Sequence, residues 1–308
     1  MTPLRQRLAW LFEDLHERQS GCENPWVLQR VRRLGGSGTI RLTGGTSLRF
    51  GRSQYPDVRK LVALASMGVA FRPRGQRHVG AEWAVSMDPP VVETPRGTTF
   101  ALASVHPGIF AETFLHEIHF PGFDAAGRNV VDAGGFVGDT ALYYASLGMR
   151  VSSYEPDGQN VALFRANLAL NPELAPLISV YEEAVAEDGS VSFTQGGFGG
   201  GGIRGKTPSV RVVRSSGLRT ILNRLDGPPF LLKADVKGAE FDIVRQPAIR
   251  EFEKVQMEYA TDYAPGRRVE DLIDGLKAAG FSRVRRFKHN WGNFSLDVHG
   301  MIHAEREP

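Results

Sequence analysis

Hydrophobic residues in the first 105 positions change their spacing several times, which predicts a mixture of short helices and hairpins. Apolar residues recur at threes and fours, the spacing of one helix face, in three segments: residues 4–15, 25–34 and 56–71. Pairs of β-like runs surround glycine-containing turns in two places: residues 39–51 and 91–104. We therefore expect an α+β extension over residues 1–105, with no chemistry evident in it.

A different pattern predicts one α/β domain over residues 106–308. Apolar strand-like runs alternate with helical spacing, and these runs are residues 129–134, 150–156, 177–185, 230–236 and 254–260. Such alternation is typical of a parallel, doubly wound sheet with right-handed crossovers. Two final runs, residues 282–287 and 296–305, are joined by a loop and fit an antiparallel strand that completes the sheet.

Composition narrows the class of protein. The chain has 308 residues and a single cysteine, Cys22, which excludes a disulfide framework and a zinc site built on several thiolates. No stretch of eighteen apolar residues occurs, so we expect a soluble, cytoplasmic protein without a membrane partner. The net charge of +3 and the pI near 9.1 permit a nucleic-acid partner without requiring one.

The stretch "DAGGFVGD", residues 132–139, is the most informative turn of the chain. It follows an apolar strand and precedes a helical pattern, and the residues at the end of the strand that point to a ligand are Asp132, Gly134, Gly135 and Gly138. In open α/β sheets a ligand binds at such a turn, beyond the carboxyl ends of the strands. The dinucleotide pattern G-x-G-x-x-G fails here, because Phe136 and Asp139 occupy its second and third glycine positions.

The failed pattern favours a ligand that is not a polyanion, since Asp139 would bring a carboxylate toward phosphate. S-adenosylmethionine, with its sulfonium, amino group and ribose, fits such a turn, and an acid such as Asp132 suits it. Glu155 ends the next strand and can accept both ribose hydroxyls, as the acid of dinucleotide sites does. Glu183 follows the third strand, near the expected position of the adenine edge.

Three runs of sequence resemble the FkbM family of S-adenosylmethionine-dependent methyltransferases: residues 112–171, 183–193 and 231–246. The resemblance implies a class I, Rossmann-like fold with a seven-stranded sheet, and O-methylation of hydroxyls on sugars and natural products. It assigns Asp132, Gly134 and Gly138 to the methionine and ribose side, Glu155 to the ribose and Glu183 to the adenine. It also puts Asp235 at the rim of the active site. We group Gly135 and Asp139 with the cofactor-binding residues.

Two positions depart from the family pattern. Such proteins commonly read Asp-x-Glu-Gly where residues 235–238 read "DVKG", so Lys237 replaces a carboxylate with a cation. Similarly, the usual Gly-Ala-Asn of the first turn appears here as Gly-Gly-Phe, residues 134–136. We expect cofactor binding to survive both changes, whereas the substrate and any acid-assisted step stay open.

Transfer of a methyl group to an alcohol requires alignment of the acceptor and removal of its proton, for which a carboxylate at the strand ends is suited. We therefore rank Asp235 first and Glu258 second as the catalytic base. Glu240, Lys237 and His289 are less favoured, and Glu240 suits a helix cap equally well.

Other motifs carry less chemistry. The glycine-rich run over residues 195–208 lacks the P-loop spacing, so we interpret it as a mobile loop. The resemblance to the FkbM family implies that this loop could cover the substrate. His116 and His119 lack a third ligand, so no metal site is expected. The "DPPV" run at residues 88–91 ends in valine and precedes the cofactor turn, which favours a plain turn.

Function is thus predicted as methyl transfer from S-adenosylmethionine to a hydroxyl of a small molecule or glycan. An RNA methyltransferase is an alternative, supported by the basic balance and the arginine clusters at residues 30–33 and 283–286. A nicotinamide-dependent oxidoreductase is a second alternative, against which the failed glycine spacing argues. A module that binds the cofactor without turnover is a third.

Overall fold

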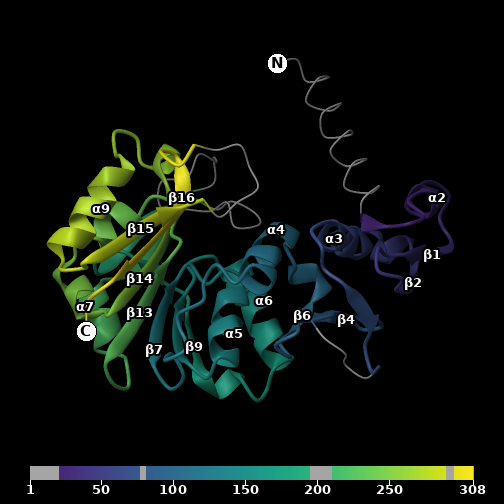
Figure 1. The fold of residues 1–308 in the computed structure, drawn as a ribbon, viewed down its shortest axis with the longest axis horizontal. Helices are drawn as coiled ribbons and strands as arrows, with labels where there is room; N and C mark the ends of the chain where they lie inside the picture. Colours follow the sequence, from purple (N-terminus) through teal and green to yellow (C-terminus); the bar gives the residue numbers. More distant parts are fainter. Residues whose placement is uncertain (1–20, 77–80, 195–209, 289–294, 308) are drawn as a thin grey trace. The chain divides into compact units, whose positions relative to one another are not determined.

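A computed structural model describes residues 21–76, 81–194, 210–288 and 295–307, and it divides the chain into two compact units, Met1–His116 and Glu117–Pro308 (Figure 1). The sequence pattern instead suggests a boundary after residue 105. The difference arises because the helical segment after residue 106 packs within the first unit. There the rings of Phe110 and Phe114 lie 4.8 and 5.4 Å from that of Phe100.

The first unit contains short helices and two small sheets. Its helices are α2 (Trp26–Leu34), η1 (Arg52–Gln54), α3 (Tyr55–Ser66), η2 (Leu102–Ser104), α4 (Pro107–Phe110) and the π-helical turn η3 (Ala111–Leu115). Its strands are β1 (Ser37–Arg41), β2 (Ser47–Gly51), β3 (Phe71–Pro73), β4 (Trp83–Met87), β5 (Pro90–Glu93) and β6 (Thr99–Ala101). The strands β1 and β2 form one antiparallel hairpin, and β3 to β6 form a second sheet in chain order.

Buried and exposed residues alternate along β1 and β2, which explains the first hairpin. Ile40, Leu48 and Phe50 are buried on one face, while their neighbours along both strands are exposed. The helix α2 covers this face closely, because a Cβ atom on Gly38 would lie 2.6 Å from Cγ1 of Val27. Asp88 and Pro89 of the "DPPV" run form the expected turn between β4 and β5, whereas Pro90 and Val91 already belong to β5.

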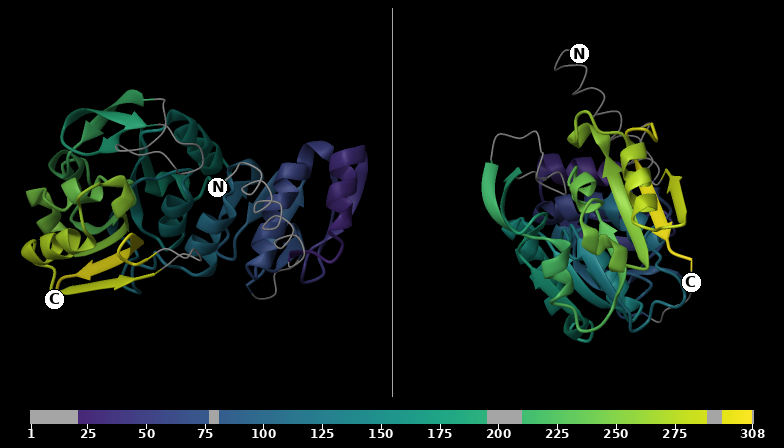
Figure 2. Two further views of the ribbon diagram at one scale, coloured as in Figure 1. Left: turned by 90° about the horizontal axis from the view of Figure 1, so that it is seen from above. Right: turned by 90° about the vertical axis from the view of Figure 1, so that its left-hand side faces the viewer.

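The second unit is built on a seven-stranded sheet of order β15-β16-β14-β13-β7-β8-β9. These strands are β7 (Asn129–Ala133), β8 (Arg150–Tyr154), β9 (Ile178–Tyr181), β13 (Pro229–Ala234), β14 (Lys254–Ala260), β15 (Arg283–Phe287) and β16 (His299–Glu305). The five strands from β9 to β14 are parallel, whereas β16 runs antiparallel to both neighbours. Figure 2 shows β14, β16 and β15 side by side along one edge. The predicted doubly wound sheet with an antiparallel last strand is confirmed.

Helices cover both faces of this sheet. They are α5 (Asp139–Ser146), α6 (Gly158–Ala169), η4 (Ala175–Leu177), α7 (Leu218–Leu222), α8 (Glu240–Ile243), η5 (Pro247–Glu251), η6 (Thr261–Tyr263) and α9 (Val269–Ala278). Leu272 of α9 shares a buried core with Val255 of β14. Tyr144 of α5 donates to Gln256, the next residue along β14, whose side chain points to the opposite face. A smaller sheet joins β10 (Ala184–Val185), β12 (Val210–Ser216) and β11 (Gly189–Thr194).

Several predicted features lie outside the described residues: the helix over residues 4–15, the glycine-rich run at residues 195–208, and His289. Among the helices that the structure describes, none is long and apolar enough to cross a membrane. The same part of the chain holds no group of three His, Cys, Asp or Glu side chains arranged for a metal ion.

Candidate functional site

The turn after β7 is held tightly against the two neighbouring strands. The backbone N–H groups of Gly134 and Gly135 both donate to the carbonyl of Tyr154 at the end of β8, at 2.9 and 3.0 Å. On the other side, the N–H of Asp235 donates to the carbonyl of Ala133. The turn therefore lies at the carboxyl ends of β7, β8 and β13, where open α/β sheets bind ligands.

Each of the three predicted glycines has a steric reason. Gly134 has a φ of +87°, and a Cβ there would lie 2.1 Å from the carbonyl oxygen of Asp235. A Cβ on Gly135 would lie 2.1 Å from Oγ of Ser153. On Gly138, which has a φ of +86°, it would lie 2.3 Å from the Phe164 ring. Close packing alone thus requires glycine at all three positions.

Asp132 lies beneath this turn with its side chain fully buried. Its carboxylate accepts hydrogen bonds from Ser153 at 2.8 Å and from Thr140, the second residue of α5, at 3.2 Å. The ammonium of Lys233 lies 3.0 Å from Oδ1 and also donates to the carbonyl of Gly134 at 2.6 Å. Asp132 therefore supports the turn from below, and a direct contact with the cofactor stays a prediction.

Lys233 keeps its charge in this buried position. Burial alone would lower the pKa of Lys233, but the carboxylates of Asp132, Asp235 and Asp139 outweigh burial, and the pKa is raised. Asp139 begins α5 and is itself buried. The sequence reasoning missed Lys233, although a lone charge inside the apolar strand at residues 230–234 is a recognisable signal.

Glu155 connects the end of β8 to the glycine turn. Its Oε2 atom accepts the N–H of Phe136 at 2.9 Å, and Oε1 accepts the N–H of Asp157 at 2.8 Å and the amide of Asn160 at 3.3 Å. Burial raises the pKa of Glu155 to about 7 despite these hydrogen bonds. The structure therefore brings Glu155 together with the turn, as the sequence predicts.

Glu183 is engaged by a different set of partners. Arg224 donates to it at 2.8 Å, Ser216 donates at 2.5 Å, and Arg214 lies 3.3 Å away. Burial opposes ionisation, but the hydrogen bonds from Arg224 and Ser216 lower the pKa of Glu183. Arg224, which sequence reasoning also missed, lies 4.9 Å above the ring of Tyr181. The predicted contact between Glu183 and the adenine would have to form while Glu183 keeps these interactions.

The two acids proposed as base are brought together by Lys237. Its Nζ lies 2.7 Å from Oδ1 of Asp235, just beyond β13, and 3.4 Å from Oε1 of Glu258, near the end of β14. Burial would lower the pKa of Lys237, but the two carboxylates outweigh it and raise the pKa. Lys237 has a φ of +47°, an uncommon conformation for a side chain that is not glycine.

Glu240 stabilises the turn formed by residues 235–238. It lies in the first turn of α8, and its carboxylate accepts the N–H groups of Val236 at 2.9 Å and Gly238 at 2.6 Å. Burial raises the pKa of Glu240 to about 7. Glu240 therefore does not cap α8, which has no side-chain cap, and its contacts instead fix the turn that carries Asp235 and Lys237.

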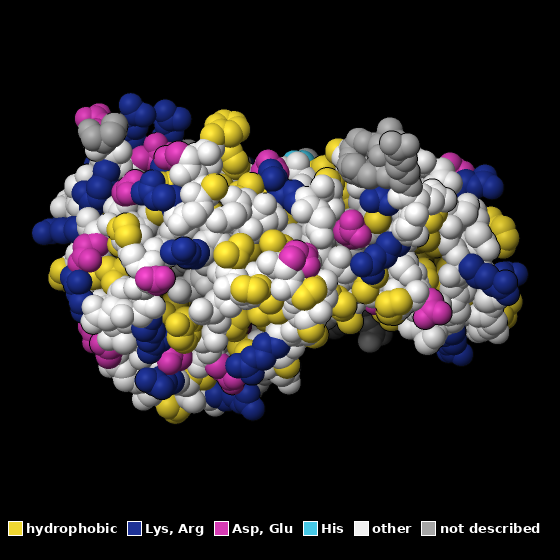
Figure 3. Space-filling model, turned by 90° about the horizontal axis from the view of Figure 1, so that it is seen from below, with side chains coloured by type: hydrophobic (Ala, Val, Ile, Leu, Met, Phe, Trp, Pro, Cys, Tyr) yellow, Lys and Arg dark blue, Asp and Glu magenta, His cyan; other side chains and the backbone are white. Residues whose placement is uncertain are grey.

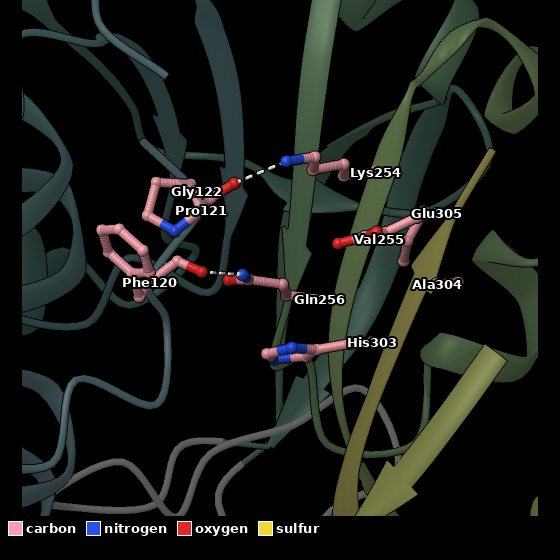
Figure 4. A pocket seen from close by; sticks show the side chains of 9 residues that line it. All are labelled: Phe120, Pro121, Gly122, Lys254, Val255, Gln256, His303, Ala304 and Glu305. Carbon is pink, nitrogen blue, oxygen red and sulfur yellow. Dashed lines mark hydrogen bonds between the residues drawn. The ribbon is translucent and has the colours of Figure 1, made fainter. Parts of the chain in front are cut away.

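A separate pocket of about 180 Å³ lies at the opposite end of β14 (Figure 4). It is lined by Phe120, Pro121, Gly122, Lys254, Val255, Gln256, His303, Ala304 and Glu305. Lys254 donates to the carbonyl of Pro121 and Gln256 to that of Phe120, at 2.8 and 3.0 Å. Burial lowers the pKa of His303 to about 4, so its imidazole is neutral at physiological pH. None of the predicted site residues lines this pocket.

Comparison with solved structures matches several methyltransferases at low sequence identity and low TM-score. A precorrin-6Y C5,15-methyltransferase from Geobacter metallireducens has a TM-score of 0.36 and 12% identity, covering 59% of this chain and 82% of that one. A SAM-dependent O-methyltransferase from Thermotoga maritima has a TM-score of 0.39 and 13% identity, covering 66% of this chain and 66% of that one. For an rRNA methylase from Streptococcus thermophilus these values are 0.40, 8%, 64% and 97%. No TM-score among these three reaches 0.5, so they carry no argument about substrate.

Comparison with protein families is decisive. Residues 128–283, half of the chain, match the model of the methyltransferase FkbM domain. Among curated proteins, none gives a significant match. The matched region contains the glycine turn, Glu155, Glu183 and the "DVKG" turn, and it decides for methyl transfer against the oxidoreductase alternative. The chain belongs to the FkbM family of methyltransferases, and its methyl donor is S-adenosylmethionine.

Proposed function

We propose that this enzyme methylates a hydroxyl group on a small molecule or a glycan. The observation that carries the proposal is the cluster of Asp235, Lys237 and Glu258, where two carboxylates meet one ammonium at the ends of neighbouring strands. A carboxylate at this position can orient an alcohol and receive its proton. The cluster adjoins the glycine turn directly, because the Asp235 carbonyl lies against Gly134.

The residues around the turn suit the cofactor. Oε2 of Glu155 accepts one hydrogen bond, from Phe136, and a carboxylate oxygen has room for two. A ribose hydroxyl can therefore be added without breaking the existing contact. Gly134, Gly135 and Gly138 let the turn pack closely against its neighbours at the strand ends, where ligands bind in open α/β sheets. In this proposal Asp132 and Asp139 act from beneath the turn, and Glu183 lies on the adenine side.

Asp235 is the better placed of the two acids. Lys237 binds its Oδ1 atom, while Oδ2 has no hydrogen-bond partner within the described part of the chain. Oδ2 is thus available to an acceptor hydroxyl, and the ammonium fixes the orientation of the carboxylate. S-adenosylmethionine supplies an electrophilic methyl group when bound. The protein must then align the acceptor, exclude water and take up the proton.

Two measurements test the proposal in sequence. Isothermal titration with S-adenosylhomocysteine should show binding that Glu155→Ala weakens. Radiolabelled methyl transfer should then be followed with matched acceptors that differ only in carrying a hydroxyl or an amine, with tRNA as a further acceptor. We expect label on the hydroxyl compounds. Label only on amines or on tRNA would reject the proposed acceptor while leaving the cofactor assignment intact.

A further inference from the structure

The first unit carries a net positive charge, whereas the second carries a net negative charge. Residues 1–116 contain fifteen Arg and Lys against nine Asp and Glu, a formal charge of +6, whereas residues 117–308 contain 22 against 25, a charge of −3. Fourteen of the fifteen basic residues are arginine. Figure 3 shows Arg and Lys side chains on both units, including several at the right of the view, where the first unit lies. A polyanion would therefore be drawn to the first unit in preference to the second.

Five exposed arginines form what we call the arginine surface: Arg30, Arg32, Arg33, Arg49 and Arg52. None of the five has a carboxylate partner within the described residues. The nearby acids are otherwise engaged, because Glu23 pairs with Arg41 at 3.3 Å and Asp57 with Lys60 at 4.0 Å. The charge of this surface is therefore not neutralised by its described neighbours.

The hairpin brings these arginines together from separate elements. Arg30 of α2 donates to the carbonyl of Ser37 at 2.9 Å, and Arg49 of β2 donates to the hydroxyl of the same residue at 3.4 Å. Ser37 also pairs across the hairpin with Gly51, the residue before Arg52. Guanidinium groups from α2 and β2 thus meet at one serine, and Arg52 of η1 follows the residue that pairs with this serine.

Two aromatic rings accompany the guanidinium groups. Trp26 is 64% exposed, and the guanidinium of Arg30 lies 5.9 Å from its ring centre. Arg32 lies at the same distance from the ring of Tyr55. Arginines that bind phosphates in a bidentate manner, beside an exposed ring on which a base can stack, are the combination that binds single-stranded nucleic acid.

We propose that the arginine surface and Trp26 bind single-stranded nucleic acid. A nucleic acid fits better than an anionic membrane, because the exposed large apolar side chains of α2 are limited to Trp26 and Leu34, with Arg30 and Arg33 between them. The surface is an interaction site in its own right. It does not require that the nucleic acid be the methyl acceptor.

Fluorescence anisotropy with labelled RNA and DNA oligonucleotides of mixed sequence tests this proposal on the full chain. Five phosphate contacts on a single strand give a slope of log K against log salt of about −3.5, so raising KCl from about 100 to about 300 mM should weaken binding about 50-fold. Trp26→Ala should weaken it between about fivefold and about 100-fold, whereas Trp26→Phe should retain most of the affinity.

Two double variants that change the net charge equally test whether the arginine surface itself, and not the net charge of the protein, binds the nucleic acid. Arg33→Glu with Arg52→Glu should abolish two phosphate contacts and make the salt slope shallower by about 1.4. Arg165→Glu with Arg250→Glu, exposed arginines of the second unit, should leave the affinity nearly unchanged. Thermal unfolding of all variants checks that they fold.

Three outcomes would overturn the proposal. Equal weakening by both double variants would show that net charge alone drives binding. Binding to phosphatidylserine vesicles with none to oligonucleotides would identify a membrane surface. Full affinity in Trp26→Ala would remove base stacking from the site.

Discussion

Nζ of Lys233 lies 3.0 Å from Oδ1 of Asp132, and both side chains are buried beneath the glycine turn. Removing one partner would leave the other as an uncompensated buried charge. We expect Lys233→Met to lower the free energy of unfolding of this unit by about 3 to 5 kcal/mol in urea denaturation. The exposed Lys277→Met serves as control and should change it by less than about 0.5 kcal/mol.

A double variant completes this prediction. Asp132→Asn combined with Lys233→Met replaces the ion pair with neutral groups of similar size, so it should be less destabilised than Lys233→Met alone. If the double variant were the less stable of the two, the buried charge would not be the cause of the loss.

Glu155 should make the stability of the apoprotein depend on pH. Burial raises its pKa from 4.5 to about 7 in the folded chain, so the folded state binds the proton more tightly than the unfolded state. The associated stability is full below about pH 4.5 and is lost as the pH rises through about 7, a loss on the order of 3 kcal/mol. Urea denaturation at several pH values should show this loss, and Glu155→Gln should reduce it. An unchanged pH dependence in the variant would contradict the assignment.

Cofactor affinity should have the opposite pH dependence. A ribose hydroxyl donates to the ionised carboxylate of Glu155, so the affinity for S-adenosylhomocysteine should rise as the pH passes through about 7. Titration calorimetry should find this rise absent in Glu155→Gln. Glu155→Ala should lose about 1.5 to 3 kcal/mol of binding free energy, whereas exposed Glu173→Gln should lose none. Equal affinities in the Glu155→Ala variant and the original protein would place Glu155 outside the site.

Gly134→Ala tests how closely the turn after β7 meets the turn after β13. A Cβ there would lie 2.1 Å from the Asp235 carbonyl, so both turns must move and the free energy of unfolding should fall by at least about 3 kcal/mol. Gly266→Ala is a matched control, because its φ of +82° is similar and nothing lies within 4 Å of the added atom. Urea denaturation compares the two variants, and similar losses in both would mean that backbone strain, not the contact with Asp235, sets the cost.

Asp235→Asn should slow methyl transfer by about 100-fold to about 10,000-fold, because the amide cannot accept the acceptor proton. S-adenosylhomocysteine affinity should stay close to its original value. Glu258→Gln should slow the reaction less, since Asp235 is ranked first as base. Single-turnover methyl transfer measures both variants, and a larger loss in Glu258→Gln would reverse the ranking.

Much of the second unit could be predicted from the sequence, because period-2 and period-3.6 patterns report directly on strands and helices. The placement of β16 between β14 and β15 could not, since periodicity carries no information on which strands become neighbours. The boundary between the two units could not be predicted from the sequence either. It depends on Phe110 and Phe114 packing near Phe100, and a contact between residues distant in sequence leaves no local pattern.

The candidate site likewise contains some residues that the sequence predicts and others that it does not. Glycines and acids at strand ends, such as Gly134 and Glu155, are visible in the sequence because their positions follow from the fold. The contacts of Lys233 with Asp132 and of Arg224 with Glu183 form only through the folding of distant segments, so the sequence marks Lys233 as an unusual charge but does not reveal its partner. The roles of the site residues in cofactor binding and catalysis stay predictions.

The strand order of the second unit also constrains how the protein can be synthesised. Within the described residues β15 pairs with β16 alone, yet it leaves the ribosome before β16 does. Until residues 299–305 have paired with β14, the strand Arg283–Phe287 has no main-chain partner and could join a strand of another nascent chain. Its three arginines disfavour such pairing by charge repulsion, so we expect this basic run to oppose aggregation of the newly made chain.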